Sequence, residues 1–228
     1  MKNHTFNSSA GKSLAPFIVI EGIDGTGKTT QLKLLKGWIE KNYCYSVHTT
    51  REPTDGPIGK LLKEALKGRV KLDSICHALL FAADRIDHLD LEIESNLRRG
   101  ILVLCDRYYL SSFAYQWRDM PDDLEWIESI NMWARHPDLT ILIDVPPEVC
   151  MERINQSRGQ TELFEDIETL RVVRDNYLKL VDRRQSRESV EIIDGNRSAS
   201  VIHGDVCKLV RDAMQDFVTV GTNDTIHT

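Results

Sequence analysis

A glycine-rich segment carries the strongest chemical signal in the sequence. Residues 22–29 read Gly-Ile-Asp-Gly-Thr-Gly-Lys-Thr and fit the pattern GxxxxGK(S/T), between an apolar run and an amphipathic stretch. Glycines let the backbone wrap closely around a phosphate, and successive N–H groups and the positive end of the following helix then face the anion. The segment predicts a nucleoside triphosphate site, in which Lys28 reaches the β and γ phosphates and Thr29 offers its hydroxyl to Mg²⁺. The residues expected to hold the triphosphate are Gly22, Ile23, Asp24, Gly25, Thr26, Gly27, Lys28, Thr29 and Thr30.

A second polar group follows another apolar run, in the segment "LCDRYYLSSFAYQ". Asp106 ends that run, at the carboxyl edge where doubly wound sheets bind their ligands. Arg107 beside it offers a two-pronged group for a phosphate. We expect Asp106 to act near the metal, orienting a metal-bound water or the acceptor. The alternative is an ordinary surface ion pair after a strand.

Two more clusters could contact an acceptor molecule. In "REPTDGPIG", Arg51 is a candidate phosphate ligand or a solvated loop residue, and proline statistics favour a trans bond before Pro53. In "LLFAADRIDHL", Phe81, Arg85 and His88 stand at helical spacing on one face. A ring and a guanidinium one turn apart could bind a planar base. Spacing alone favours the simpler interpretation of a core Phe81 beside an exposed Arg85.

The elements that position these residues follow from the apolar pattern. Strands are expected at residues 17–21, 46–51, 100–106, 139–145 and 189–194, and helices at 29–41, 57–66, 73–99, 121–135, 148–156, 167–184 and 201–217. Because strands alternate with helices, the sheet should be parallel with helices on both faces. The predicted fold class is therefore α/β, a P-loop NTPase with three layers α/β/α, a five-stranded parallel sheet and a helical lid.

Composition limits the kind of protein further. The 228 residues suit one large domain, expected at residues 16–218 with a lid at about 150–165, and the unpatterned residues 1–15 and 219–228 are expected to be frayed. A net charge of -6 argues against a broad nucleic-acid surface. The five cysteines form no CxxC pair, so free thiols are expected, and no apolar run approaches the roughly 20 residues that cross a bilayer. We expect a cytoplasmic protein.

Among phosphate-handling proteins, a small kinase fits best. A GTPase needs a guanine-reading Asn-Lys-x-Asp segment after a late strand, and "EIIDGNRSAS" matches it poorly. A motor or translocase usually has a longer chain and a basic track. A small kinase needs a second anion pocket beside the glycine loop, with arginines for the acceptor phosphate and a carboxylate near the metal, and the residues around Asp106 and Arg107 supply these.

Taken in order, five segments resemble the thymidylate kinase family: "FIVIEGIDGTGKTTQ", "TTREPTDGPIG", "LLFAADRIDHL", "GILVLCDRYYLSSFAYQ" and "ILIDVPPEVCMERI". The resemblance covers most of residues 17–195. It implies transfer of the γ phosphoryl group of ATP to thymidine 5'-monophosphate (dTMP) with Mg²⁺, by an enzyme that is commonly a homodimer. Open alternatives are a kinase of another pyrimidine monophosphate or nucleoside, and a catalytically silent nucleotide-binding protein.

The resemblance also implies roles for individual residues. Phe81 would stack on thymine and Arg85 would bind its carbonyl group, which reverses the preference drawn from spacing. Arg51 and Arg107 would grip the acceptor phosphate, and Asp24 would meet the 3'-hydroxyl of the sugar. Tyr115 would pack beneath the deoxyribose. The full set expected at the substrate is Asp24, Arg51, Glu52, Pro53, Phe81, Arg85, Arg107, Ser112, Tyr115 and Gln116.

The family resemblance further implies where the catalytic arginine lies. Some members carry an arginine inside the glycine loop, where this chain has Gly25. The arginine should then come from the lid segment "RINQSRGQTELFE", which offers Arg153 and Arg158. Arg158 before a glycine is the better match, and a second lid arginine of many relatives is replaced by Leu163. With Lys28 and Asp106, these two arginines complete the expected catalytic set.

Overall fold

Five parallel strands lie at the centre of the fold, in the order β2-β3-β1-β4-β5. The computed structural model describes residues 15–157 and 166–218. Neighbouring strands pair in parallel throughout, as the alternation of apolar runs and helical stretches predicts. The strands are β1 (Phe17–Glu21), β2 (Val47–Arg51), β3 (Leu102–Asp106), β4 (Leu139–Asp144) and β5 (Val190–Asp194).

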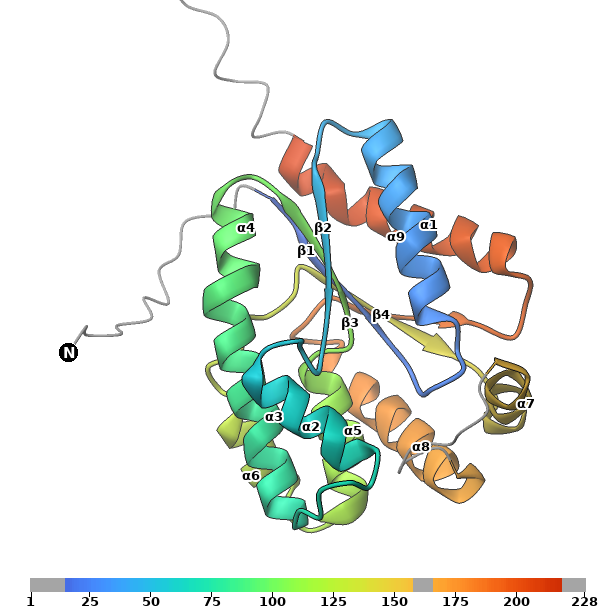
Figure 1. The fold of residues 1–228 in the computed structure, drawn as a ribbon. Coiled ribbons are helices and arrows are strands. Elements are labelled where there is room, and N and C mark those ends of the chain that lie inside the picture. Colours follow the sequence, from blue (N-terminus) through green and yellow to red (C-terminus); the bar gives the residue numbers. More distant parts are fainter. Residues whose placement is uncertain (1–14, 158–165, 219–228) are drawn as a thin grey trace, which may run out of the picture.

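Helices cover both faces of the sheet (Figure 1). α1 and α9 pack together on one face, while α4 contacts β3 and α8 contacts β5 from the other. The helices of the described ranges are α1 (Lys28–Asn42), α2 (Pro57–Leu66), α3 (Ser74–His88), the π-helical turn η1 (Leu89–Ile93), α4 (Glu94–Arg98), α5 (Tyr109–Asp119), α6 (Leu124–Ile130), α7 (Pro147–Ser157), α8 (Ile167–Arg184) and α9 (Ala199–Val218). The predicted α/β/α arrangement with a five-stranded parallel sheet is confirmed.

Several helices differ from their predicted bounds for local reasons. The helix expected over 73–99 is α3, which continues through η1 into α4, and the Asp73 carboxylate caps its start by accepting from the Ile75 N–H at 2.8 Å. The helix expected over 121–135 was too long, because the chain turns at Asn131 after α6. α5 was not predicted at all. Its residues are largely buried between other helices, so they show no clear polar face.

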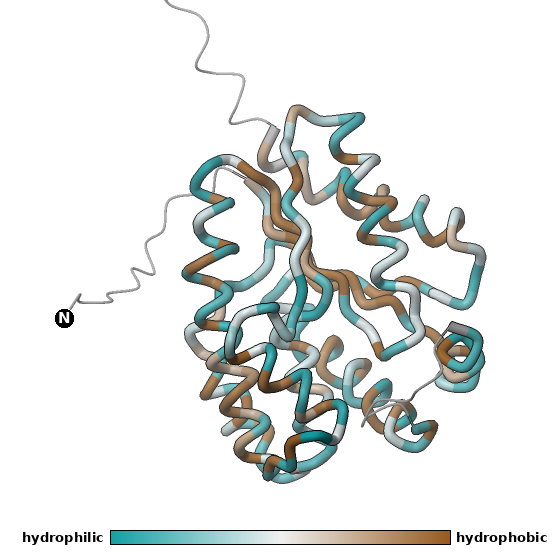
Figure 2. Tube along the Cα trace, viewed as in Figure 1, coloured by the Kyte–Doolittle hydropathy of each residue, from teal (hydrophilic) through white to brown (hydrophobic). Residues whose placement is uncertain are grey.

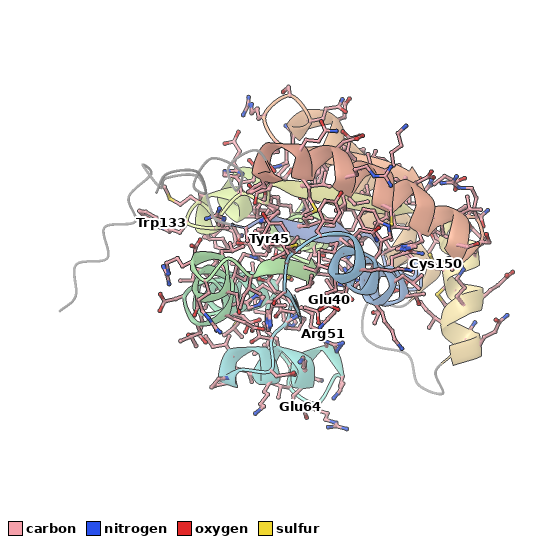
Figure 3. All side chains as sticks on the ribbon, turned by 90° about the horizontal axis from the view of Figure 1, so that it is seen from above. Glu40, Tyr45, Arg51, Glu64, Trp133 and Cys150 are labelled. Carbon is pink, nitrogen blue, oxygen red and sulfur yellow. The ribbon has the colours of Figure 1, made fainter. Side chains whose placement is uncertain are left out.

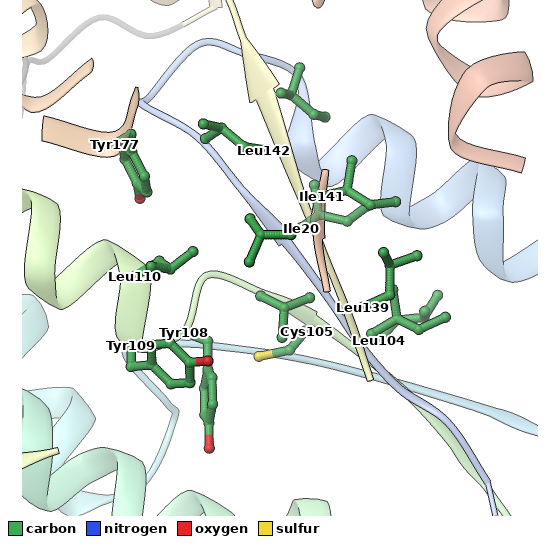
Figure 4. Close-up of a cluster of buried hydrophobic side chains, with 14 of the residues drawn as sticks. Ile20, Leu104, Cys105, Tyr108, Tyr109, Leu110, Leu139, Ile141, Leu142 and Tyr177 are labelled. Carbon is green, nitrogen blue, oxygen red and sulfur yellow. The ribbon is translucent and has the colours of Figure 1, made fainter. Parts of the chain in front are cut away.

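The core explains why the central strands read as apolar runs. β1 is buried along its whole length, and the first four residues of β3 and first five of β4 are also buried. In Figure 2 these strands form the hydrophobic interior, and the polar residues gather on the outward sides of the helices. Figure 4 shows Ile20, Leu104 and Ile141 in this core, with Tyr108 and Tyr109 below them. Strands buried on both faces need no polar alternation.

The parallel register brings the predicted site residues to one edge. Ile20 in β1 is aligned with Asp106 in β3, and Asp106 is aligned with Arg51 in β2. The loop after β1, the end of β2 and the end of β3 therefore open on the same side. This is the carboxyl edge of the sheet, where ligands bind in doubly wound folds.

Two further findings concern membrane-spanning helices and thiols. Within residues 15–157 and 166–218, the helices are too short or too polar to cross a bilayer. All five cysteines are free thiols, as their spacing predicts.

Candidate active site

The loop between β1 and α1 is shaped to hold phosphate. Gly25 and Gly27 have φ angles of 84° and 90°, in the left-handed region that favours glycine. The Thr26 hydroxyl donates to the Ile23 carbonyl at 3.1 Å and closes the loop on itself. At the start of α1, no side chain of the described residues caps the first turn. N–H groups at an uncapped helix start, behind glycines, bind phosphate readily.

Lys28 is the buried cation of this loop. Its Nζ donates to the carbonyl oxygens of Gly22 and Ile23 at 2.9 and 2.8 Å, and the residue is 6% exposed. Burial, together with the positive charge of Arg107, lowers the pKa of Lys28 below its ordinary value. A buried ammonium group is stabilised strongly by an anion, so the site favours a negatively charged ligand.

Thr29 and Asp106 fit the position of a magnesium ion. The Thr29 hydroxyl donates to Asp106 Oδ2 at 3.0 Å. Asp106 Oδ1 is buried and has no hydrogen-bond partner among the described residues, so a cation would satisfy it. One hydroxyl and one carboxylate suit Mg²⁺, which keeps water and substrate phosphates as further ligands. Within the described ranges, no cluster of three or more His, Cys, Asp or Glu side chains could hold a metal by itself.

Arg107 lies beside the phosphate loop in a fixed position. Its φ of 69° is unusual for a residue other than glycine, and such strained conformations gather at functional sites. Its guanidinium donates to Asp24 Oδ1 at 2.8 Å, to the Ser111 hydroxyl at 3.1 Å and to the Tyr115 hydroxyl at 3.2 Å. Although burial opposes it, the Asp24 carboxylate raises the pKa of Arg107. The predicted phosphate ligand and the predicted sugar ligand are thus one ion pair.

The Glu21 carboxylate holds the helix that carries these residues. Glu21 Oε1 accepts from the backbone N–H groups of Tyr108 and Ser111 at 2.8 and 3.2 Å. Glu21 Oε2 accepts from the hydroxyls of Ser111 and Tyr177 at 2.6 and 3.0 Å. A carboxylate with four donors at the start of α5 satisfies N–H groups that the helix leaves unpaired. It fixes α5 against β1 and α8.

Arg85 is a buried group at the end of the cavity away from the phosphate loop. It is 1% exposed, and its Nη2 and Nε donate to Glu52 Oε2 at 2.6 and 3.0 Å. Nη2 also donates to the Ser112 hydroxyl at 2.9 Å, and Nη1 donates to Asn131 Oδ1. Phe81 is only partly buried and lines the cavity. The spacing-based interpretation of a core Phe81 beside an exposed Arg85 was therefore wrong.

The loop after β2 is clamped onto α3. The bond between Glu52 and Pro53 is cis, whereas proline statistics favoured trans. The Asp84 carboxylate accepts from the Thr54 N–H at 2.8 Å and from its hydroxyl at 2.6 Å. A Cβ atom at Gly59 would lie 2.1 Å from the Thr54 carbonyl oxygen, so the start of α2 also presses on this loop. These contacts fix the segment that follows Arg51.

One cavity of about 620 Å³ brings most of the predicted residues together. Seen from above, Arg51 lies next to α2, which carries Glu64 (Figure 3). Arg51 lines this cavity together with Lys63 of α2 and Lys67, the residue that follows it. The predicted residues that line it are Asp24, Gly25, Gly27, Lys28, Thr29, Thr30, Arg51, Glu52, Pro53, Phe81, Arg85, Asp106, Arg107, Ser112, Tyr115, Gln116 and Arg153. Gly22, Ile23 and Thr26 belong to the same loop but do not line the cavity.

α7 closes the phosphate side of this cavity. Arg153 lines it and donates to the carbonyl oxygens of Gly25 and Gly195 at 3.4 and 3.3 Å. A Cβ atom at Gly25 would lie 2.6 Å from the Cys150 carbonyl oxygen, so α7 packs directly on the loop. Arg158 and the rest of the expected lid up to residue 165 lie outside the described residues.

Sequence reasoning missed the side chains that hold the site residues. Glu21 had a usable signal, because it is a carboxylate at the end of an otherwise apolar run. Asp84 and Asn131 had none that separates them from surface residues, and His88 was expected on the face of Phe81 and Arg85 but without a role. His88 Nδ1 lies 3.2 Å from Glu52 Oε1 and its Nε2 lies 2.7 Å from the Thr50 hydroxyl, a contact that only the folded chain reveals.

The cavity contains the phosphate loop and also Arg51, Arg85 and Arg107. The fold and the site therefore define a P-loop kinase that holds another anion beside the triphosphate. A family model described as "Thymidylate kinase" matches residues 20–206. The "Probable thymidylate kinase" of Thermococcus onnurineus is 43% identical over 203 residues, 85% of this chain and 96% of that protein. The protein of the same name from Pyrobaculum calidifontis is 44% identical over 200 residues, 87% of this chain and 97% of that protein. The chain belongs to the thymidylate kinase family, and it is an enzyme.

The contact between Gly25 and α7 yields a prediction about stability. Gly25→Ala should lower the free energy of unfolding by about 2 to 4 kcal/mol. The new methyl group would clash with the Cys150 backbone, and an alanine would have to keep the left-handed φ of Gly25. Gly27→Ala is the matched control: its φ of 90° is as strained, but nothing lies within 4 Å of its Cβ position. It should lower the free energy by only about 1 kcal/mol. Urea unfolding measures the free energy of unfolding of both variants. Equal losses would show that the contact between Gly25 and α7 does not contribute to stability.

Proposed function

We propose that this enzyme transfers the γ phosphoryl group of ATP to dTMP, giving dTDP and ADP. The observation that carries the proposal is the single cavity that joins the phosphate loop at Lys28 to the buried guanidinium of Arg85. An acceptor that spans this cavity places a phosphate near the loop and a planar base near Arg85. The family membership of the chain and the names of its relatives support the same acceptor.

The base end of the cavity favours an oxygen on the base. Guanidinium groups have only donors, so Arg85 matches a ring carbonyl such as that of thymine and opposes the 4-amino group of cytosine. Phe81 lines the cavity one turn before Arg85 on α3 and would stack on the ring. Gln116 Oε1 is buried without a hydrogen-bond partner among the described residues and lines the same cavity. It could accept from a ring N–H.

The sugar and the acceptor phosphate would lie between these two ends. Tyr115 is 7% exposed and its hydroxyl reaches Asp24 Oδ2 at 3.4 Å, so its ring forms a wall where a 2'-hydroxyl would be crowded. The Asp24 carboxylate would accept from a 3'-hydroxyl. Arg51 and Arg107 both line the cavity and would bind the phosphate of the acceptor. This arrangement favours a deoxyribonucleotide.

The reaction itself needs positioning and charge neutralisation more than covalent help. An oxygen of the acceptor phosphate attacks the γ phosphorus, and the bond from that phosphorus to the oxygen bridging to the β phosphorus breaks. Lys28 stabilises the negative charge of the transferring group. Mg²⁺, held by Thr29 and Asp106 together with the nucleotide, would neutralise the β and γ oxygens. Asp106 would thereby help to hold the metal and orient a water bound to it.

The remaining positive charge would come from the α7 side of the cavity. Arg153 is already tied to two carbonyl groups, and each contact is long, at 3.4 and 3.3 Å. We assign the transition-state role to Arg158, which the sequence places five residues further along, and a supporting role to Arg153. Leu163 removes a second lid arginine that many relatives have, so these two carry the charge.

We also propose that the enzyme is a cytoplasmic homodimer. Ile75 and Leu79 lie one turn apart on α3 and are 53% and 48% exposed, and Leu61 on the neighbouring α2 is 40% exposed. Apolar side chains gathered on adjacent helices are typical of a protein interface. The free thiols suit a reducing compartment. A mass of one subunit in light scattering at micromolar concentration would contradict the dimer.

A panel of monophosphates tests the proposed substrate. With ATP and Mg²⁺, dTMP should show the highest kcat/KM, and dCMP should be at least about 100-fold poorer because its amino group faces donors. Phe81→Ala should raise the KM for dTMP by about tenfold through the lost stacking. Trp133→Ala is the control and should leave the KM for dTMP unchanged. Trp133 is also aromatic, but it is 57% exposed and does not line the cavity. Faster turnover of dCMP or UMP would exclude the proposal.

Single substitutions separate the two lid arginines. Arg158→Ala should lower kcat by about 100-fold and change the KM for dTMP by less than about threefold, because it acts in the transition state. Arg153→Ala should lower kcat less. Arg171→Ala removes an arginine of α8 that is 49% exposed and pairs with Glu148, and it should leave the rate unchanged. If Arg158→Ala keeps the wild-type kcat while Arg153→Ala loses it, the roles are reversed.

A further inference from the structure

Asn131 is a buried amide that the proposed reaction leaves unused. It lies in the turn that ends α6 and is 5% exposed. Its Nδ2 donates to the Ile127 carbonyl oxygen at 2.8 Å, which leaves Oδ1 facing the Arg85 guanidinium. The amide orientation is therefore set by a backbone group, and the oxygen is the atom presented to the arginine.

The donors of Arg85 can be counted one by one. A guanidinium has five N–H groups. The Nε hydrogen and one Nη2 hydrogen go to Glu52, and the other Nη2 hydrogen goes to the Ser112 hydroxyl. One Nη1 hydrogen goes to Asn131. Among the described residues, a single Nη1 hydrogen is left without an acceptor. Because Arg85 lines the cavity, this N–H can donate a hydrogen bond to a base.

Without Asn131, no other side chain of the described residues would hold Nη1. Glu52 accepts from the edge formed by Nε and Nη2, Ser112 accepts from the other Nη2 hydrogen, and the guanidinium carbon lies 5.3 Å from the centre of the Tyr108 ring. Both Nη1 hydrogens would then lack a fixed partner among the described residues, so Nη1 would be the part of the group left without a restraint. The hydrogen bond from an N–H to a base carbonyl weakens quickly when the N–H···O angle departs from linear.

We propose that Asn131 is a positioning residue for base recognition, which fixes the Arg85 guanidinium so that its last N–H is directed at the carbonyl oxygen of the bound base. The assignment rests on the proposed function for the identity of the base. Glu52 holds the edge formed by Nε and Nη2, and Asn131 holds Nη1. Asn131 lies 46 residues from Arg85 in the chain, so α6 contributes to the acceptor site without touching the substrate.

Two near-isosteric variants separate this role from the helix-ending role of the same side chain. Asn131→Leu and Asn131→Asp both lose the donor to the Ile127 carbonyl, but only Asn131→Asp keeps an oxygen for Arg85. We expect Asn131→Leu to raise the KM for dTMP by about tenfold with kcat within about twofold and the KM for ATP unchanged. Asn131→Asp should stay within about threefold of the wild-type KM for dTMP. Equal rises in both variants, or no rise in either, would overturn the proposal.

Asn176→Leu is the matched control for simple loss of a buried amide. Asn176 is 7% exposed and donates to the Ala114 carbonyl oxygen at 2.9 Å, and this amide is not among the partners of Arg85. It should lower the melting temperature as Asn131→Leu does and leave the KM for dTMP unchanged. All kinetics are compared at a temperature where melting curves show each variant folded, and Asn131→Ala replaces Asn131→Leu if the latter does not fold.

The same experiment distinguishes failure of the proposal from failure of the proposed function. If the wild-type enzyme prefers another monophosphate, the proposed function is wrong. The ratio of KM values between Asn131→Leu and Asn131→Asp is then measured with that preferred substrate, and a ratio near one would still overturn the role of Asn131. A ratio of about three or more supports it.

Discussion

The acceptor half of the site depends on one buried ion pair, between the Arg85 guanidinium and the Glu52 carboxylate. Their side chains are 1% and 3% exposed, so neither charge is solvated and each requires the other. Elements far apart in the chain meet at this pair: the end of β2 through Glu52, α3 through Arg85 and His88, α5 through Ser112, and the turn after α6. The proposed base pocket therefore has its geometry in the absence of substrate, which would reduce the entropy lost on binding.

The phosphate half is organised by the backbone more than by side chains. The left-handed glycines and the uncapped start of α1 present N–H groups, and Lys28 is desolvated against carbonyl oxygens. The N–H groups and the buried positive charge of such a loop lack partners when it is empty, and a bound anion supplies them. Arg107 links the two halves, because its guanidinium pairs with Asp24 of the loop while the helix that follows it carries Ser112 and Tyr115. In the proposed function, the acceptor phosphate and the triphosphate would thus be held by one connected framework.

The sequence was most informative where a signal is local. Buried parallel strands are apolar throughout, and the glycine loop is a contiguous pattern, so both could be predicted from neighbouring residues alone. α5 could not, because most of its residues are buried, polar Ser112 and Gln116 among them, so burial does not follow residue polarity. The burial of Arg85 depends on Glu52, 33 positions away, and spacing along one helix cannot report such a partner. Asp84 and Asn131 were missed for the same reason.

The position of α7 decides where catalytic charge can come from. At Gly25 there is no room even for a methyl group, because the Cys150 carbonyl oxygen would lie 2.6 Å from it. An arginine in the loop and α7 in this place therefore exclude each other. The close packing carries Arg153, one turn beyond Cys150, over the Gly25 carbonyl and into the cavity. Gly25 and Arg153 are thus two consequences of the same packing of α7 on the loop. The helix that leaves no room for an arginine at position 25 also supplies positive charge.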